Sequence, residues 1–426
     1  MSHTTVIPLR RPDTIDDPLT AVLRDGARRL LAQAIEAEAE AFLAEMKGKR
    51  LADGRERLVR HGHGPERLVQ TGIGSVPVRR VKLRDRGAEA GSDEAGAERI
   101  RFTSAILPRW ARRTRSLDAL LPVLYLRGIS TGDFQEALAA LLGKEAPNLS
   151  PSVIARLKGE WEADYARWQR RELSARHYVY VWADGIYLQA RMEPQAECML
   201  VLIGATPEGK KELVGFQVGV RESAQSWREL LVGLKARGLA VAPELATGDG
   251  SLGFWKALEE VFPTTRHQRC WMHKASNVLN KLPKSIQPAA KQDLREIWQA
   301  PDRATAEAAV ATFAEKYAAK YEKAVVCLVK DRDALLTFYD FPAEHWEHLR
   351  TSNPIESVFA TVRHRTVRTK GALSQDTARL MVFKLIMAAA KTWRRLKGDN
   401  QLPKVVQGVT FTNGVEVTKA PEQTAA

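Results

Sequence analysis

The chain has few cysteines, no long hydrophobic segment and fewer acidic than basic residues. Its three cysteines among 426 residues are too few and too widely spaced for a disulfide framework, which excludes the small disulfide-stabilised secreted proteins. No apolar run approaches the roughly 18 residues that cross a bilayer, and the polar stretch 1–17 lacks the apolar core of a signal peptide. We therefore expect a soluble, cytoplasmic protein with no membrane partner.

The excess of basic residues points to a polyanionic partner. The sequence holds 65 Lys or Arg against 51 Asp or Glu, a net charge of +14. Residues 363–397 alone contain ten Lys or Arg and one Asp, a net charge of +9. Binding of such residues to phosphates releases condensed counterions, so nucleic acid is expected ahead of an anionic membrane surface.

The length of 426 residues predicts two or three folded units. Within residues 1–113 we expect a helix over 18–47, a small hairpin over 67–86 and a linker over 87–98. Apolar residues recur along the helix at helical spacing, which indicates a core face or an oligomer face, with the core favoured. The hairpin carries a cluster of basic residues: Arg79, Arg80, Lys82, Arg84 and Arg86.

Residues 114–173 are expected to form a mainly helical DNA-binding region. Three short helices are predicted, the third capped by Ser150 or Ser152: 116–126, 131–142, and from that cap through Trp161. Three compact helices with tight turns match a helix-turn-helix unit. Arg156 and Lys158, near the start of the third helix, are then expected to contact DNA. A plain helical linker domain is the alternative.

Residues 174–400 alternate between strands and helices. The expected strands share short apolar patterns: 178–184, 198–205, 212–220, 244–247 and 265–270. Helices are expected over 223–238 and 252–261. Three antiparallel strands followed by helix, strand, helix and strand is the order of a ribonuclease H-like core.

Residues 271–349 are almost purely helical in pattern and predict an all-helical insertion in this core. A final helix is expected from Pro354, and residues 401–426 are expected to form a C-terminal tail. The predicted fold class is a multidomain α/β protein. In it, a ribonuclease H-like catalytic core with an all-helical insertion follows a mainly helical DNA-binding region.

Three acidic residues are candidates for a catalytic site. Asp184 and Asp249 each follow an apolar strand and precede a glycine, where backbone can approach a ligand. Each aspartate alone is a weak signal, because many α/β proteins place one there. Glu356 also has a structural interpretation: with Asn353 as N-cap and Pro354 at the first helical position, it can cap the helix. It lies, however, off the apolar face of that helix.

Three converging carboxylates suit Mg²⁺, with Mn²⁺ as its expected substitute. Two such ions can activate an attacking oxygen and stabilise a leaving one in an in-line displacement at phosphorus. The same site then serves hydrolysis by water and strand transfer by a DNA 3′-hydroxyl, without a covalent enzyme intermediate. A dense cationic run after Glu356 suits phosphate contacts: Arg363, Arg365, Arg368 and Lys370.

Cysteine and histidine pairs flank the predicted insertion. Cys270 with His273 and His345 with His348 could complete a tetrahedral zinc site where the insertion leaves and rejoins the core. Structural roles in buried, hydrogen-bonded segments are the favoured alternative.

The run from Ser130 to Arg368 closely resembles the Mutator-type transposases of bacterial insertion sequences. The matching stretches occur in order: YLRGISTGDFQEAL, YVYVWADGIY, GDGSLGFW, RCWMHK, DFPAEHWEHLRTSNPIES and VRTKG. The resemblance implies a DDE triad of Asp184, Asp249 and Glu356, which binds the catalytic metal ions. Their separations of 65 and 107 residues agree with the family pattern.

The resemblance also implies partners. A DDE transposase would bind the terminal inverted repeats of its element and its target DNA, in a homo-oligomer that holds two ends and associates with the nucleoid. Two alternatives stay open: an inactive, transposase-derived DNA-binding regulator, and a structure-specific ribonuclease H-like nuclease.

Overall fold

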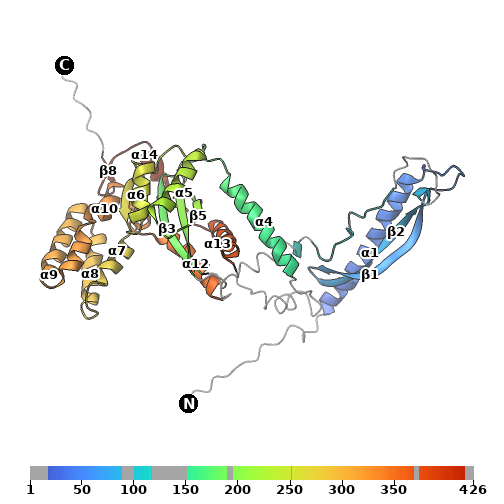
Figure 1. Cartoon of the computed structure of the whole chain (residues 1–426), viewed down its shortest axis with the longest axis horizontal. Helices are drawn as coiled ribbons and strands as arrows, with labels where there is room; N and C mark the ends of the chain where they lie inside the picture. The colour runs from blue at the N-terminus through green and yellow to red at the C-terminus, as the bar shows by residue number, and fades with distance from the viewer. Residues whose placement is uncertain are drawn as a thin grey trace, which may run out of the picture. The chain divides into compact units, whose positions relative to one another are not determined.

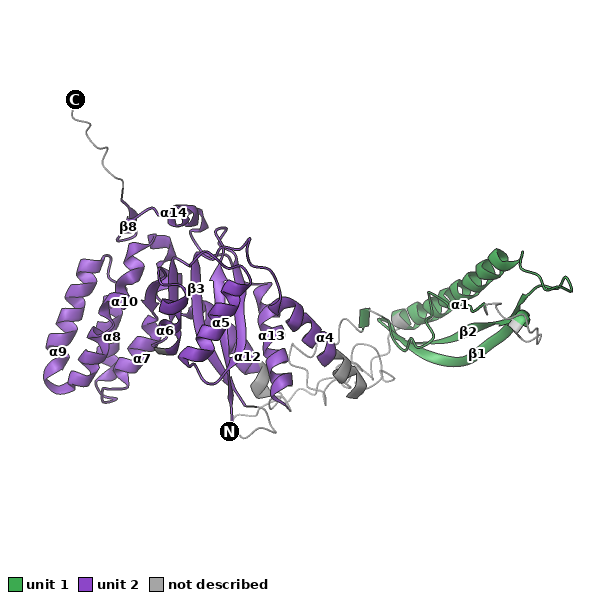
Figure 2. Ribbon diagram, turned by 45° about the horizontal axis from the view of Figure 1, so that its top comes forward, with its two compact units in different colours: residues 1–157 green, residues 158–426 purple. Residues whose placement is uncertain are grey.

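The computed structural model describes residues 18–88, 100–114, 116–117, 151–189, 195–250, 252–368 and 374–417 (Figure 1). The chain divides into two compact units, residues 1–157 and residues 158–426 (Figure 2). Among the helices that the structure describes, none has the length and apolar character needed to cross a membrane.

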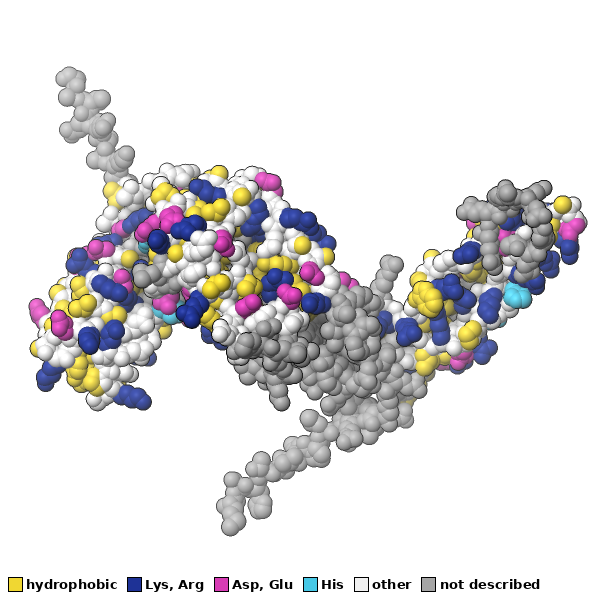
Figure 3. All heavy atoms as spheres, in the orientation of Figure 1, with side chains coloured by type: hydrophobic (Ala, Val, Ile, Leu, Met, Phe, Trp, Pro, Cys, Tyr) yellow, Lys and Arg dark blue, Asp and Glu magenta, His cyan; other side chains and the backbone are white. Residues whose placement is uncertain are grey.

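Unit 1 packs one long helix against a two-stranded antiparallel hairpin. The elements are α1 (Pro18–Met46), β1 (Leu58–Thr71), β2 (Gly74–Asp85) and the short 3₁₀ helix η2 (Arg86–Ala88). Valines on one face of the hairpin meet the helix and Leu107 in a small core: Ile35, Ala39, Val69, Val76, Val78 and Val81. Figure 3 shows Lys and Arg side chains along the exposed surface of this hairpin, which was expected to be basic.

The hairpin begins nine residues earlier than the sequence predicted. β1 starts at Leu58, but its register shifts between Arg60 and Glu66, and Gly62 has a φ of 74°. Such bulges interrupt the alternation of apolar and polar residues. The stretch HGHGPER therefore carries no strand pattern, although it pairs with β2.

The apolar stripe of α1 is only partly a core face. Ile35 of the predicted stripe is buried, whereas Leu19, Val22 and Leu30 are 69%, 69% and 68% exposed. Arg24 donates to the carbonyl of Ile73 in the hairpin turn. Since the hairpin turns back beside Arg24, the first turn of α1 extends past the hairpin.

Of the three helices predicted for the DNA-binding region, one lies within the described residues. It is α4 (Pro151–Gln169), which continues eight residues beyond Trp161. Its second half belongs to unit 2, where Tyr165 packs against Phe216 and Phe383 with ring centroids 5.9 and 5.1 Å apart. The helices expected over 116–126 and 131–142 lie outside the described residues, apart from helical Ser116 and Leu117.

Unit 2 is built on a five-stranded mixed sheet with the order β5-β4-β3-β6-β7. The strands are β3 (Tyr180–Leu188), β4 (Glu197–Ala205), β5 (Lys211–Gly219), β6 (Leu245–Gly248) and β7 (Arg266–Arg269). β5, β4 and β3 are antiparallel, while β3, β6 and β7 are parallel. The predicted succession of three antiparallel strands, helix, strand, helix and strand is confirmed.

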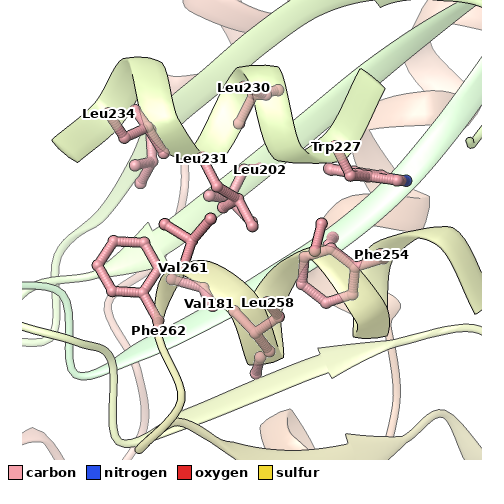
Figure 4. Packing of buried hydrophobic residues seen from close by; sticks show 14 of the residues in the cluster. Val181, Leu202, Trp227, Leu230, Leu231, Leu234, Phe254, Leu258, Val261 and Phe262 are labelled. Carbon is pink, nitrogen blue, oxygen red and sulfur yellow. The ribbon is translucent and has the colours of Figure 1, made fainter. Parts of the chain in front are cut away.

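Two helices cover one face of this sheet. They are α5 (Ala224–Ala236) and α6 (Leu252–Val261), and both match their predicted positions closely. The Ser223 hydroxyl caps α5 by accepting from the N–H of Ser226. The apolar side chains of α5, α6 and alternate positions of β3 and β4 form the main core (Figure 4). The spacing along each element decides which residues enter it.

Residues 271–349 are helical, as their sequence pattern predicted. They contain α7 (Trp271–Leu279), α8 (Gln287–Trp298), α9 (Arg303–Val329), α10 (Arg332–Leu336), the 3₁₀ helices η3 (Thr337–Asp340) and η4 (Ala343–His345), and α11 (Trp346–Leu349). Helices α7, α8 and α9 pack against one another on the side of the sheet away from β5 (Figure 1).

The chain then returns to the sheet through α12 (Asn353–Arg368) and α13 (Gln375–Ala390). Residues 399–416, expected mostly as a tail, form η5 (Asp399–Gln401), α14 (Leu402–Val406) and the strand pair β8 (Phe411–Thr412) and β9 (Val415–Glu416). They fold onto the insertion because Gly414 exchanges backbone hydrogen bonds with Tyr339 and Ala343.

Candidate active site

Asp184 and Asp249 come together where two parallel strands separate. The pairing of β3 with β6 stops at Ala183 opposite Gly248, and Asp249 follows β6 directly. The sequence predicted that β3 ends at Asp184. The strand instead continues to Leu188, because β4 pairs with it that far. The first aspartate is therefore fixed within a strand, while the second begins a loop.

Aromatic and cationic side chains hold the backbone of Asp249. The indole N–H of Trp255 donates to its carbonyl at 2.7 Å, and the guanidinium of Arg269 donates to the same oxygen at 3.1 Å. The Arg269 guanidinium lies over the Trp255 ring, 4.5 Å from its centroid. These contacts fix the backbone of Asp249, which is partly exposed at the end of β6.

Glu356 lies in the first turn of α12, and the insertion brings it to the sheet. The Trp182 indole donates to the carbonyl of His348 at 2.8 Å, and the Thr247 hydroxyl donates to that of Leu349 at 2.9 Å. One side chain from β3 and one from β6 thus hold the segment that precedes α12. These two hydrogen bonds bring the start of α12 to the sheet, although 107 residues separate Asp249 and Glu356 in the sequence.

The helix itself directs Glu356 away from the core. Its predicted apolar face is confirmed, since four residues are 0–1% exposed: Ile355, Val358, Phe359 and Val362. The helix starts at Asn353, which was predicted to cap it. The carbonyl of Ser352 accepts from the N–H of Glu356 instead, and the Ser352 hydroxyl donates to Glu356 Oε1 at 2.7 Å. Glu356 therefore bonds to a side chain rather than closing the predicted capping box.

The charges of the other two carboxylates act on Asp184. Burial, together with the charges of Asp249 and Glu356, raises the pKa of Asp184 to about 6. The N–H of Gly185 donates to its Oδ1 at 2.8 Å and opposes this rise, as does the charge of His273. A cation that enters the site would relieve the repulsion.

Glu222, between β5 and α5, is a fourth carboxylate that the sequence pattern does not reveal. A Cβ added at Gly185 would lie 2.7 Å from Glu222 Cδ, so the glycine makes room for this side chain. Burial, with the charges of Asp184 and Asp249, raises the pKa of Glu222 to about 7. Its neighbour Ser223 carries a capping signal, but nothing in the sequence relates Glu222 to the aspartates.

Cys270 and His273 lie beside Glu356. Together they form the one metal-compatible group of three found among the described residues, with one ligand atom from each within 4.8 Å of the others. Burial raises the pKa of the Cys270 thiol, but hydrogen bonds with His273 and Ser352 outweigh burial and lower it. The hydrogen bond with Cys270 is the main cause that raises the pKa of His273 to about 9.

His345 and His348 do not join this group, so the structure does not assemble the four-ligand zinc site that the sequence suggested. His345 is fully buried and bonds to the Tyr180 hydroxyl and the Gly398 carbonyl, both at 2.8 Å. His348 Nε2 accepts from the N–H of Lys397 at 3.2 Å. These two histidines have the hydrogen-bonded structural roles that were the favoured alternative.

The candidate DNA contacts are only partly described. Arg363 is exposed on α12, two turns after Glu356, and Lys158 is half-buried in α4. The side chains of the remaining four candidates lie outside the described part of the chain: Arg156, Arg365, Arg368 and Lys370.

Known proteins similar to the chain are transposases. The family model "Transposase, Mutator family" matches residues 7–395. The chain is 50% identical over 295 residues to the transposase for insertion sequence element IST2 of Acidithiobacillus ferrooxidans, which covers 68% of this chain and 100% of that protein. It is 49% identical over 298 residues to the transposase for IS6120 of Mycolicibacterium smegmatis, covering 70% and 92%.

A more distant relative covers more of the chain. The transposase for ISRM5 of Rhizobium meliloti is 26% identical over 374 residues, which is 87% of this chain and 88% of that protein. The chain is thus a DNA-recombining enzyme by its class, a transposase. It belongs to the Mutator family, as the sequence motifs predicted.

Proposed function

We propose that this transposase binds the terminal inverted repeats of an insertion sequence and catalyses DNA cleavage and strand transfer at Asp184, Asp249 and Glu356. One observation carries the proposal: carboxylates from β3, the end of β6 and α12 gather at one edge of the sheet. Burial chiefly, and the charges of Asp249 and Glu356 to a smaller extent, raise the pKa of Asp184 to about 6. Such a concentration of negative charge is typical of sites that bind catalytic cations.

We further propose that the sheet is a ribonuclease H-like core. The support is its order, in which three antiparallel strands are followed by two parallel ones beside the first strand. In this arrangement the paired aspartates lie at the point where β3 and β6 diverge. The glutamate comes from a helix after the insertion.

The donor set fits hard divalent cations, because all three side chains offer carboxylate oxygens. Asp184, Asp249 and Glu356 would hold two Mg²⁺ ions, or Mn²⁺ in their place. When bound, these ions would activate the attacking oxygen and stabilise the leaving oxygen at phosphorus. Trp255 and Arg269 fix the backbone of Asp249, Gly185 fixes a carboxylate oxygen of Asp184, and Ser352 orients Glu356.

We propose that DNA binds to basic residues of α12, of the stretch that follows it, and of α4. Arg363 lies on the same helix as Glu356 and is suited to a phosphate near the cut. We expect the same role for Arg365, Arg368 and Lys370, and a role in terminal-repeat recognition for Arg156 and Lys158. The reaction joins two element ends, so we expect a homo-oligomer on the DNA, associated with the bacterial nucleoid.

The test combines binding and chemistry on DNA that carries the element ends. Mobility shifts measure binding, and labelled substrates with Mg²⁺ or Mn²⁺ measure cleavage and the strand transfer of a precleaved end. Specific binding without cleavage by the wild type would instead indicate the DNA-binding regulator. Hydrolysis without strand transfer would indicate the structure-specific nuclease.

A further inference from the structure

The side chains of Cys270, His273 and Glu356 meet where the insertion leaves and rejoins the core. Cys270 lies between β7 and α7 and is 1% exposed, so its thiol is fixed in the protein. The side chains of His273 and Glu356 are 34% and 40% exposed, so a small ion can reach them from solvent. The ligand atoms of all three lie within 4.8 Å of one another.

Besides the hydrogen bond between Cys270 and His273, a single hydroxyl lies against all three side chains of this cluster. The hydroxyl of Ser352 faces Cys270 Sγ at 3.2 Å, Glu356 Oε1 at 2.7 Å and His273 Nδ1 at 3.4 Å. A hydroxyl has one hydrogen, so it cannot donate to the sulfur and the carboxylate together. The hydroxyl therefore leaves a lone pair on the sulfur or on the carboxylate without its hydrogen, and a bound cation can accept that lone pair.

The surroundings of the sulfur also suit a metal. The backbone N–H of Ser352 donates to Cys270 Sγ at 3.3 Å. In metal sites, hydrogen bonds donated to the ligand atoms by surrounding groups orient the ligands and adjust the properties of the bound ion. The sulfur is thus held in place by a backbone contact, within 4.8 Å of the ligand atoms of His273 and Glu356.

The donor types select the ion. One thiolate, one imidazole and one carboxylate form a set that suits Zn²⁺, with three protein ligands and a fourth position open to water. Mg²⁺ prefers oxygen ligands only, so it has no use for Cys270. This set differs from the four-residue clip suggested by the sequence, because the third ligand is the glutamate of the acidic site.

We propose that Cys270, His273 and Glu356 bind one Zn²⁺ ion, and that this ion inhibits the transposase because it occupies Glu356. Zn²⁺ binds a thiolate and a neutral imidazole, so the protons held by Cys270 and His273 leave to solvent, and no redox change occurs. The inhibitory part rests on the proposed function, in which Glu356 holds the catalytic metal. Zinc and magnesium then compete for one carboxylate, so higher Mg²⁺ weakens the inhibition.

Cobalt measures binding independently of activity. The full chain, purified without a metal-affinity tag and stripped with a chelator, is titrated with Co²⁺ and then Zn²⁺. We expect one Co²⁺ per chain, a sulfur-to-cobalt charge-transfer band, and loss of the band when Zn²⁺ is added. Absence of the band in the wild type would overturn the zinc site.

Matched variants locate the site. Cys270→Ser should abolish the band, while Cys327→Ser, at another buried cysteine in α9, should retain it. The half-exposed His273 offers a second variant whose folding does not depend on a core position. His273→Gln should weaken Co²⁺ binding at least about tenfold, and wild-type affinity in this variant would contradict the assignment. Thermal melting of each variant verifies folding.

Cleavage in Mg²⁺ with increasing Zn²⁺ tests the inhibition. We expect stoichiometric Zn²⁺ to reduce wild-type cleavage at least about tenfold, and His273→Gln to need about tenfold more Zn²⁺, each relative to its own zinc-free rate. Full activity with zinc bound would overturn the inhibitory role. No wild-type cleavage without zinc would contradict the proposed function instead, while the cobalt titration would still decide the zinc site.

Discussion

The two ends of the helical insertion each carry two potential metal ligands three positions apart, Cys270 with His273 and His345 with His348. At the first end, His273 is half-exposed and lies beside Glu356, with a pKa raised to about 9 chiefly by its bond with Cys270. At the second end, His345 is fully buried between Tyr180 and Gly398. Equal spacing therefore leads to unequal roles, because partners and burial decide what a histidine can do.

The largest effect is expected at the acidic group beside the first end. Asp184→Asn, Asp249→Asn and Glu356→Gln should each lower cleavage and strand transfer about a thousandfold or more, since metal ligation contributes several kcal/mol to transition-state stabilisation. Mobility shifts should show DNA binding within about twofold of wild type.

The matched control is Glu307→Gln, at an exposed glutamate of α9, which should cleave at the wild-type rate. Near-normal cleavage by Glu356→Gln would return that residue to a purely structural role. It would also remove the functional contrast between the two ends.

The second end should matter for stability instead. His345→Ala leaves the Tyr180 hydroxyl and the Gly398 carbonyl without their buried partner and should lower the free energy of unfolding by about 2–4 kcal/mol. His273→Ala, at a half-exposed position, should cost less than about 1 kcal/mol. Denaturant unfolding of the zinc-free proteins measures both, and similar losses would break the comparison.

Ser352 connects the first end to the glutamate and should have a smaller effect. Ser352→Ala removes the hydroxyl that orients Glu356, which should raise the Mg²⁺ concentration for half-maximal cleavage by about tenfold. Ser352→Thr keeps a hydroxyl and should restore most of the affinity. An unchanged Mg²⁺ requirement in Ser352→Ala would show that Glu356 needs no such support.

The smallest effects concern pH, and they have opposite signs at the two ends. The raised pKa of His273 means that the folded, metal-free state binds more protons there between pH 6.5 and about 9. Its contribution to stability is present below pH 6.5 and is lost as the pH rises through about 9. Burial lowers the pKa of His348 to about 4, so its contribution is present above pH 6.5 and is lost as the pH falls through about 4.

Unfolding free energies of His273→Gln and His348→Gln, measured in chelator across this range, should reveal the two windows. The difference from wild type should narrow at alkaline pH for the first variant and at acid pH for the second. Parallel curves for both variants would mean that neither histidine changes its proton affinity on folding.

Local patterns predicted much of the fold. The apolar faces of α5 and α12 and the bounds of α6 follow from residue spacing, because burial of one stripe is the same requirement in any tertiary context. The hairpin start at Leu58 and the exposed half of α1 were not foreseen. Bulges hide the strand pattern at the start of the hairpin. The start of α1 is exposed because the hairpin that packs against this helix turns back beside Arg24.

The candidate site was only partly predictable from the sequence. Asp184, Asp249 and Glu356 stand in recognisable motifs, and Ser352 lies in the same motif as Glu356, but no sequence pattern relates Glu222 to the site. Glu222 reaches the aspartates because Gly185 leaves space beside Asp184. The contact joins β3 to the segment between β5 and α5. Such proximity depends on how strands and loops are arranged and leaves no periodic signal.

The sequence by itself determined the charge, the succession of strands and helices and the family motifs, because these depend on residue type and on short-range spacing. Only the tertiary structure decided that Cys270 and His273 lie with Glu356 while His345 and His348 lie elsewhere. The physical reason is the return of the insertion along β3 and β6. There, Trp182 and Thr247 hold backbone carbonyls more than a hundred residues away.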